Sequence, residues 1–217
     1  MVGTVGGAGF FSFAPRKVLA GTGNGGMVVT RDPDLARSVR LPRLWPPSEH
    51  EVPVARRLAA SGAGHVVEGH NLNLDPIQAA VLGPKFPRLD AWAALRQHVA
   101  DCYGERLHGV TEIKTPEVPD TLRHAWRNYV ITIPARDRVR AAPRETGIAT
   151  AVLYTPPVHL QPVYRELGLG PGSCPGAEAV APRLLALPMN PGLADEQVDE
   201  VADALVEAVH DARVAPA

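Results

Sequence analysis

Lysine is scarce in this chain of 217 residues, and one of its three lysines is placed where it could do chemistry. Lys17 follows a predicted strand and the pair Pro15-Arg16, and it precedes a glycine-rich segment, GTGNGG, at 21–26. An amine in such a place can act as a nucleophile and form a Schiff base with a carbonyl cofactor. Ser12 precedes it by five residues, so its hydroxyl could bind a phosphate together with backbone N–H groups. On spacing alone, a catalytic lysine and a solvated loop lysine both remain open.

Composition and charge exclude several other classes of protein. The net charge is −1 with both signs spread along the chain, so a nucleic-acid-binding surface is not expected. No run of about 18 apolar residues is present, so no membrane span is expected. The first residues lack the basic segment that opens a secretory signal, which favours a cytoplasmic protein. No zinc-ligand motif occurs, so no metal site is predicted, and Cys102 and Cys174 are interpreted as inert.

Apolar periodicity and turn residues predict a mixed α/β chain that must position these groups. The predicted strands are 8–14, 26–30, 127–133 and 148–154, and the predicted helices are 33–41, 75–107, 136–146, 175–187 and 195–212. The stretch 42–66 is rich in proline and is expected to be an irregular connection.

Proline makes up 22 of the 217 residues, about twice ordinary usage. Four prolines fall inside predicted helices, namely Pro84, Pro87, Pro143 and Pro182. Each would cost about 3 kcal/mol if the helix continued through it. Two interpretations stay open: the helices end a few residues from their predicted bounds, or the gene copy is decaying.

Four segments, in order along the chain, resemble one protein family. Residues 11–30, FSFAPRKVLAGTGNGGMVVT, resemble the lysine segment of the DegT/StrS family of pyridoxal-phosphate (PLP) sugar aminotransferases. Residues 69–80, GHNLNLDPIQAA, resemble the family element G-x-N-x-R-x-D-x-x-Q-A-A, and residues 154–164, YTPPVHLQPVY, resemble Y-P-x-P-V-H-L-Q-P-x-Y. Residues 171–199, with AEAVAPRLLALPMNPGLADEQ, resemble the family's C-terminal signature. The resemblance covers essentially the whole chain and implies the fold type I of aspartate aminotransferase.

The resemblance implies a role for five residues. Lys17 would form the Schiff base with PLP and then move the proton between cofactor and substrate carbons. Ser12 would bind the PLP phosphate. Asn71 would bind the phosphate of a neighbouring subunit's cofactor, which implies a homodimer. Tyr154 and His159 would lie near the sugar pocket.

Departures from the family pattern are of two kinds. Asn24 and Asn73 stand where the family usually has Asp and Arg, and the second change weakens the charge expected near the phosphate. A full family member is also much longer than this chain. The absent portion would supply the acid that pairs with the pyridine nitrogen, an aromatic that stacks on the ring, and most strands of the large domain.

The resulting expectation is the C-terminal portion of a fold type I enzyme. Residues 1–70 would be a remnant of the PLP-binding large domain with two strands, 71–110 a linking helix, and 111–217 the small α/β domain. The expected reaction transfers an amino group from glutamate or glutamine to a keto sugar, often nucleotide-linked. The alternative is a non-catalytic remnant or partner module that needs a separate N-terminal half. A dehydratase variant is disfavoured because those relatives replace the lysine with histidine.

Overall fold

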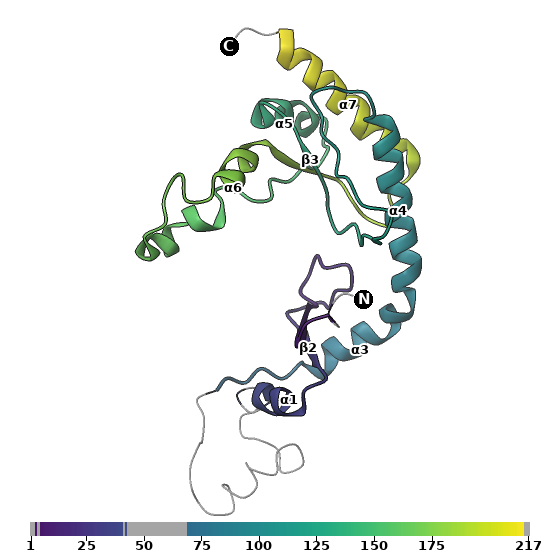
Figure 1. The fold of residues 1–217 in the computed structure, drawn as a ribbon. Helices are drawn as coiled ribbons and strands as arrows, with labels where there is room; N and C mark the ends of the chain where they lie inside the picture. Colours follow the sequence, from purple (N-terminus) through teal and green to yellow (C-terminus); the bar gives the residue numbers. More distant parts are fainter. Residues whose placement is uncertain (1–2, 4, 41, 43–68, 215–217) are drawn as a thin grey trace, which may run out of the picture. The chain divides into compact units, whose positions relative to one another are not determined.

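The computed structural model describes residues 3, 5–40, 42 and 69–214 (Figure 1). These residues form two compact units, Met1–Leu89 and Asp90–Ala217, which we call the N-terminal and the C-terminal unit. The division falls within the linking segment predicted at 71–110, so the three-part domain division stays a prediction. The connection predicted at 42–66 lies, apart from Pro42, outside the described residues.

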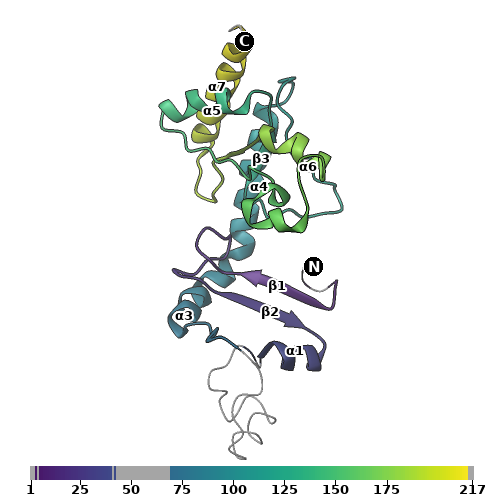
Figure 2. The ribbon, with the colours of Figure 1, turned by 90° about the vertical axis from the view of Figure 1, so that its left-hand side faces the viewer.

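The N-terminal unit contains a two-stranded antiparallel sheet, in which the strands lie side by side (Figure 2). Strand β1 (Ala8–Ser12) pairs with β2 (Gly26–Thr30) from Ala8 opposite Thr30 to Ser12 opposite Gly26. Helix α1 (Pro33–Arg40) follows, and the Asp32 carboxylate caps it by accepting the N–H groups of Asp34 and Leu35. Both strands and this helix were predicted, within one or two residues.

The long helix predicted from 75 to 107 is divided. Helix α3 (Pro76–Lys85) begins where Asp75 accepts the N–H of Ile77, a 3₁₀ turn η2 (Phe86–Arg88) follows, and α4 (Leu89–Arg106) continues the chain. Pro87 lies in the first positions of η2, where a missing N–H costs little. Pro84 lies inside α3 but in its last turn.

The C-terminal unit is built on a second antiparallel pair. Strand β3 (Tyr129–Thr132) pairs with β4 (Leu184–Leu187), from Tyr129 opposite Leu187 to Thr132 opposite Leu184. Helices α5 (Arg136–Glu145) and α7 (Asp195–Val214) pack against each other. The shorter elements are η3 (Val158–Leu160), η4 (Pro162–Leu167), α6 (Pro175–Val180) and η5 (Ala181–Arg183).

Two predicted elements are wrong. Residues 148–154 do not form a named strand; only Ala151 makes an isolated bridge, to Ala186. The helix predicted at 175–187 ends at Val180, passes through η5 and becomes β4. The physical reason is tertiary: Leu185 and Leu187 extend beside β3 and become buried in the core, which outweighs the helical preference of their segment.

The buried apolar core of the C-terminal unit joins α4, β3, β4, α5 and α7. Tyr103, Ile131, Leu185 and Leu205 are among its fully buried members. Pro143 is also fully buried within α5, which continues to Glu145 instead of breaking at this proline. Among the described residues, no helix is long and apolar enough to cross a membrane.

Candidate functional site

Two residues predicted to bind the cofactor lie close together in the chain: Ser12 is the last residue of β1, and Lys17 stands in the turn that follows. The Ser12 hydroxyl accepts the N–H of Ala14 at 3.4 Å, and the Ala14 carbonyl accepts the N–H of Lys17 at 3.2 Å. Arg16 adopts a positive φ of 74°, which turns the chain sharply just before the lysine. Lys17 is half-buried, and its amine has no hydrogen-bond partner among the residues that the structure describes. Ser12 is exposed at the end of its strand, so both groups are open to a ligand.

The glycine-rich turn is held against α3 by a single amide. The Gln78 Oε1 atom accepts the N–H of Thr22 at 2.8 Å, the Thr22 hydroxyl at 3.2 Å and the N–H of Gly23 at 2.8 Å. A Cβ at Gly21 would lie 2.6 Å from this same oxygen, so a larger residue there would displace the Gln78 amide. The Lys85 amine also donates to the Ala20 carbonyl at 2.8 Å. Helix α3 therefore fixes the segment that follows Lys17.

Asn71 lies in the extended segment before α3 and is exposed. Its side chain makes no contact among the described residues that would assign it a role. The neighbouring His70 is tied by its backbone N–H to the Pro42 carbonyl at 2.8 Å. Asn73, the position where the family usually has arginine, is exposed as well. Binding of a neighbouring subunit's cofactor by Asn71 stays a prediction.

The two residues predicted near a sugar pocket belong to the C-terminal unit and differ sharply in exposure. Tyr154 is 66% exposed, whereas His159 is only 9% exposed. The His159 Nε2 atom lies 2.9 Å from the Glu178 carboxylate, so its ring is fixed by a charged partner. The Tyr154 side chain is therefore open to a ligand, whereas the His159 ring is buried and held by Glu178.

Glu178 organises the loop before α6. Its carboxylate accepts the N–H of Gly172 at 2.8 Å and the N–H of Cys174 at 3.0 Å, in addition to contacting His159. These backbone hydrogen bonds, followed by the contact with His159, lower the pKa of Glu178 below its usual value. Glu178 thereby links the segment of His159 to the start of α6.

Sequence reasoning assigned no role to Gln78 or Glu178. The signal was present, because both residues stand inside motifs that carry the family resemblance, Gln78 in DPIQAA and Glu178 in GAEAV. The bonds they make link positions far apart in the chain, which spacing alone could not show. Ser12 and Lys17 lie on one turn, whereas Tyr154 and His159 lie in the other unit.

The residues of the lysine turn fit a phosphorylated aldehyde. A half-buried amine without a partner among the described residues suits capture of a carbonyl carbon, and an exposed hydroxyl on the same turn suits a phosphate oxygen. Lys85, in contrast, is engaged with the Ala20 carbonyl. The chemistry of the donor set therefore agrees with PLP.

Comparison with solved structures defines the class of protein. The structure of DesV from S. venezuelae, solved in complex with a ketimine intermediate, matches with a TM-score of 0.82 and 34% identity, over 93% of this chain and 52% of that one. The fold is thus that of a sugar-aminotransferase-like α/β protein. The chain belongs to the DegT/DnrJ/EryC1/StrS aminotransferase family, whose sequence profile matches residues 1–206.

Two curated relatives show which proteins the chain resembles in sequence. The erythromycin biosynthesis sensory transduction protein EryC1 of Saccharopolyspora erythraea is 40% identical over 92% of this chain and 51% of its own length. The UDP-N-acetyl-3-dehydro-α-D-glucosamine 3-aminotransferase of Acidithiobacillus ferrooxidans is 36% identical over 96% of this chain and 53% of its own length. The chain therefore spans about half the length of the curated relatives it matches.

Proposed function

We propose that this chain carries the lysine-bearing part of a PLP-dependent sugar aminotransferase. The observation that supports it most is the half-buried Lys17 amine, which has no partner among the described residues and stands just before a segment held by Gln78 and Lys85. Family membership supplies the reaction class. The proposed substrate is a keto sugar, nucleotide-linked by analogy with the UDP-sugar named for the Acidithiobacillus relative, and the proposed donor is glutamate or glutamine.

Each residue of the turn has a distinct task in this proposal. PLP, when bound, supplies an electron sink for the substrate carbon. Lys17 Nζ would hold the cofactor through its aldehyde carbon, and as a free amine it would move a proton between the substrate and cofactor carbons. Ser12 Oγ donates to a phosphate oxygen. Gln78 accepts hydrogen bonds from Thr22 and Gly23 and so holds the turn that follows the lysine.

Three further residues have binding roles in this proposal. Tyr154, largely exposed, would contact the sugar, and His159 would be oriented toward the same pocket by Glu178. Asn71 would reach the cofactor phosphate of a second copy, which makes a homodimer part of the proposal. An exposed side chain at Asn71 is compatible with such a contact.

The chain's three lysines make a direct test possible. The full chain is incubated with PLP and reduced with borohydride, and its peptides are then analysed by mass spectrometry. We expect a stable phosphopyridoxyl adduct on Lys17 and its loss in Lys17→Ala. Lys114→Ala is the matched control, because this exposed lysine is remote in sequence and should leave the Lys17 adduct unchanged. An adduct spread evenly over the lysines would overturn the proposal.

A second candidate is a partner module that acts only with a separate polypeptide. The observation that favours it is that both faces of the β1–β2 sheet expose an opposed apolar pair. Phe10 and Val28 are 76% and 37% exposed on one face, and Phe11 and Met27 are 40% and 51% exposed on the other. Exposed apolar side chains of this kind are typical of sheet faces that other elements cover. The adduct experiment separates the candidates, since a module of this kind forms no Lys17-dependent adduct by itself.

A further inference from the structure

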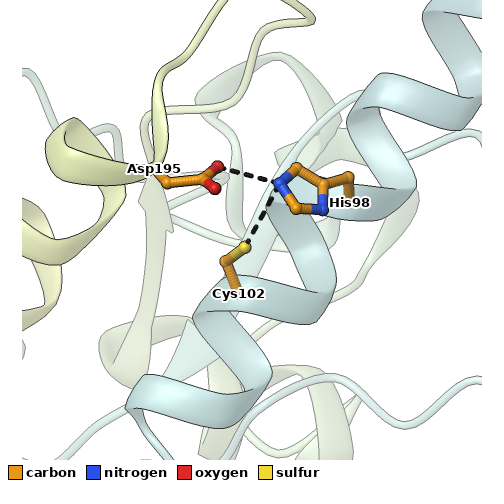
Figure 3. A group of neighbouring side chains, drawn as sticks. All are labelled: His98, Cys102 and Asp195. Atoms are coloured by element: carbon orange, nitrogen blue, oxygen red, sulfur yellow. Dashed lines mark hydrogen bonds and ion pairs between the residues drawn. The ribbon is translucent and has the colours of Figure 1, made fainter.

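Three side chains with metal-ligating atoms converge in the C-terminal unit, whereas the lysine turn belongs to the N-terminal unit. His98 and Cys102 are on α4, and Asp195 is the first residue of α7 (Figure 3). The His98 Nε2 atom lies 2.8 Å from Asp195 Oδ1 and 3.7 Å from Cys102 Sγ. The three ligand atoms all lie within 4.8 Å of one another. The cluster is independent of the proposed cofactor chemistry.

The geometry of the three atoms is close to that of a tetrahedral metal centre. Zinc binds histidine nitrogen at about 2.0–2.1 Å, cysteine sulfur at about 2.3 Å and carboxylate oxygen at about 2.0–2.2 Å, which places tetrahedral ligand atoms about 3.4–3.6 Å apart. The separation of 3.7 Å between His98 Nε2 and Cys102 Sγ already agrees with this value. The 2.8 Å between His98 Nε2 and Asp195 Oδ1 is a hydrogen-bond distance, and it would have to widen by about 0.6 Å around a bound ion.

The backbone places these ligands without help from a metal. His98 and Cys102 are four residues apart on α4, so they share one helix face. The neighbouring Val99 and Tyr103 are buried in the core, which fixes the rotation of that helix. Val198, fully buried, fixes the first turn of α7 in the same way. The site is thus presented by two helices whose apolar faces are anchored.

Charge and access both favour a cation. The side chains of His98 and Asp195 are 57% and 63% exposed, so an ion can enter from solvent. Asp101, Glu105 and Asp199 are the further charged groups that act on Cys102, and all three are acidic. Arg106 forms ion pairs with Asp199 at 2.9 Å and Asp203 at 2.8 Å, farther along the same two helices. It therefore does not compete with the cluster for Asp195.

We propose that His98, Cys102 and Asp195 bind a divalent transition-metal ion of the zinc type, with the fourth position open to water. A mixed set of imidazole, thiolate and carboxylate suits Zn²⁺, whereas Mg²⁺ and Ca²⁺ prefer oxygen ligands alone. Such an ion links α4 to the start of α7.

The test uses the full chain, freed of metal with a chelator and kept reduced. Isothermal titration with zinc chloride is expected to show one site per chain, and cobalt chloride is expected to give the sulfur-to-cobalt absorption of a thiolate ligand. Cys102→Ser, His98→Ala and Asp195→Asn should each weaken zinc binding at least about tenfold, which corresponds to about 1.4 kcal/mol. Cys102→Ser should also abolish the cobalt–sulfur band.

Matched controls separate this site from unspecific binding. Cys174→Ser and His210→Ala remove the same ligand types elsewhere in the same unit and should leave both measurements unchanged. Circular dichroism of each metal-free variant checks that it is folded, and Asp195→Asn preserves the size of the side chain. Zinc binding that is equal in the wild-type chain and all three site variants would overturn the proposal. A cobalt–sulfur band that depends on Cys174 would overturn it too.

Discussion

At the scale of residues, one amide oxygen holds the glycine-rich turn that follows Lys17. Gln78 accepts three hydrogen bonds from Thr22 and Gly23, and these groups are separated from it by more than fifty positions in the chain. The N–H of a residue such as Gly23 would otherwise be left half-buried without a partner. Gln78 is therefore a positioning residue for the segment that follows Lys17.

Replacing Gln78 by Ala should loosen the glycine-rich turn. Losing the shared acceptor leaves the N–H groups of Thr22 and Gly23 without a partner, at an expected cost of about 1–3 kcal/mol in local opening free energy. Faster hydrogen exchange at these two amides, measured by NMR, is the expected result. Gln78→Glu keeps an oxygen at the same place and should retain most of the protection. Equal exchange rates in Gln78→Ala and the wild-type chain would contradict the assigned role.

At the scale of elements, α6 and its preceding loop depend on one carboxylate. The pKa of Glu178 is lowered by the N–H groups of Gly172 and Cys174 and then by His159. Since the folded-state pKa lies below the unfolded value of about 4.3, the stabilisation is present above that value. It is lost as the pH falls through the folded-state pKa.

Glu178→Gln should therefore flatten the acid dependence of stability. Between about pH 5 and pH 3 we expect the unfolding midpoint of the wild-type chain to fall more steeply than that of Glu178→Gln. Thermal unfolding followed by circular dichroism measures both. Glu117→Gln removes an exposed carboxylate elsewhere in the same unit, so it should leave the wild-type slope unchanged. Parallel slopes for the wild-type chain and Glu178→Gln would show that this carboxylate does not stabilise the loop.

Sequence patterns predicted elements well where local signals agreed with burial. Asp32 and Asp75 cap helices as their residue types indicate, and β2 lies between the glycine-rich turn and the turn residues that follow it. Prediction failed at 184–187, because pairing with β3 is a property of the whole unit and leaves no local mark. Likewise, spacing alone left the role of Lys17 open. The contacts of Gln78 and the His98–Cys102–Asp195 cluster join residues far apart in the chain, which spacing cannot show.

The prolines inside the predicted helices occupy two kinds of position in the structure. Pro87 and Pro182 lie in the first positions of 3₁₀ turns, so the predicted helices simply end earlier than their patterns indicate. Pro143 lies inside α5, and its ring is buried against the core. Of the two interpretations that the sequence left open, shifted helix boundaries account for Pro87 and Pro182.

At the scale of the whole molecule, the two units differ in how much they bury. The apolar core cluster lies entirely in the C-terminal unit, whereas Leu82 is the one buried large apolar residue of the N-terminal unit among the residues that the structure describes. The chain spans about half the length of its relatives, 51% for EryC1. The exposed apolar side chains on both faces of β1–β2 are those that the other half would cover in a longer family member.

This difference predicts unequal protection of the two sheets in hydrogen exchange. Amides of β3–β4, whose Ile131 and Leu185 are fully buried, should exchange at least about a hundredfold more slowly than those of β1–β2. Adding the unmatched half of a relative such as EryC1 as a separate polypeptide should slow exchange in β1–β2 and leave β3–β4 unchanged. Exchange measured by mass spectrometry on the full chain tests both. If β1–β2 were already as protected as β3–β4, the N-terminal unit would be stable alone, and the partner-module interpretation would lose its support.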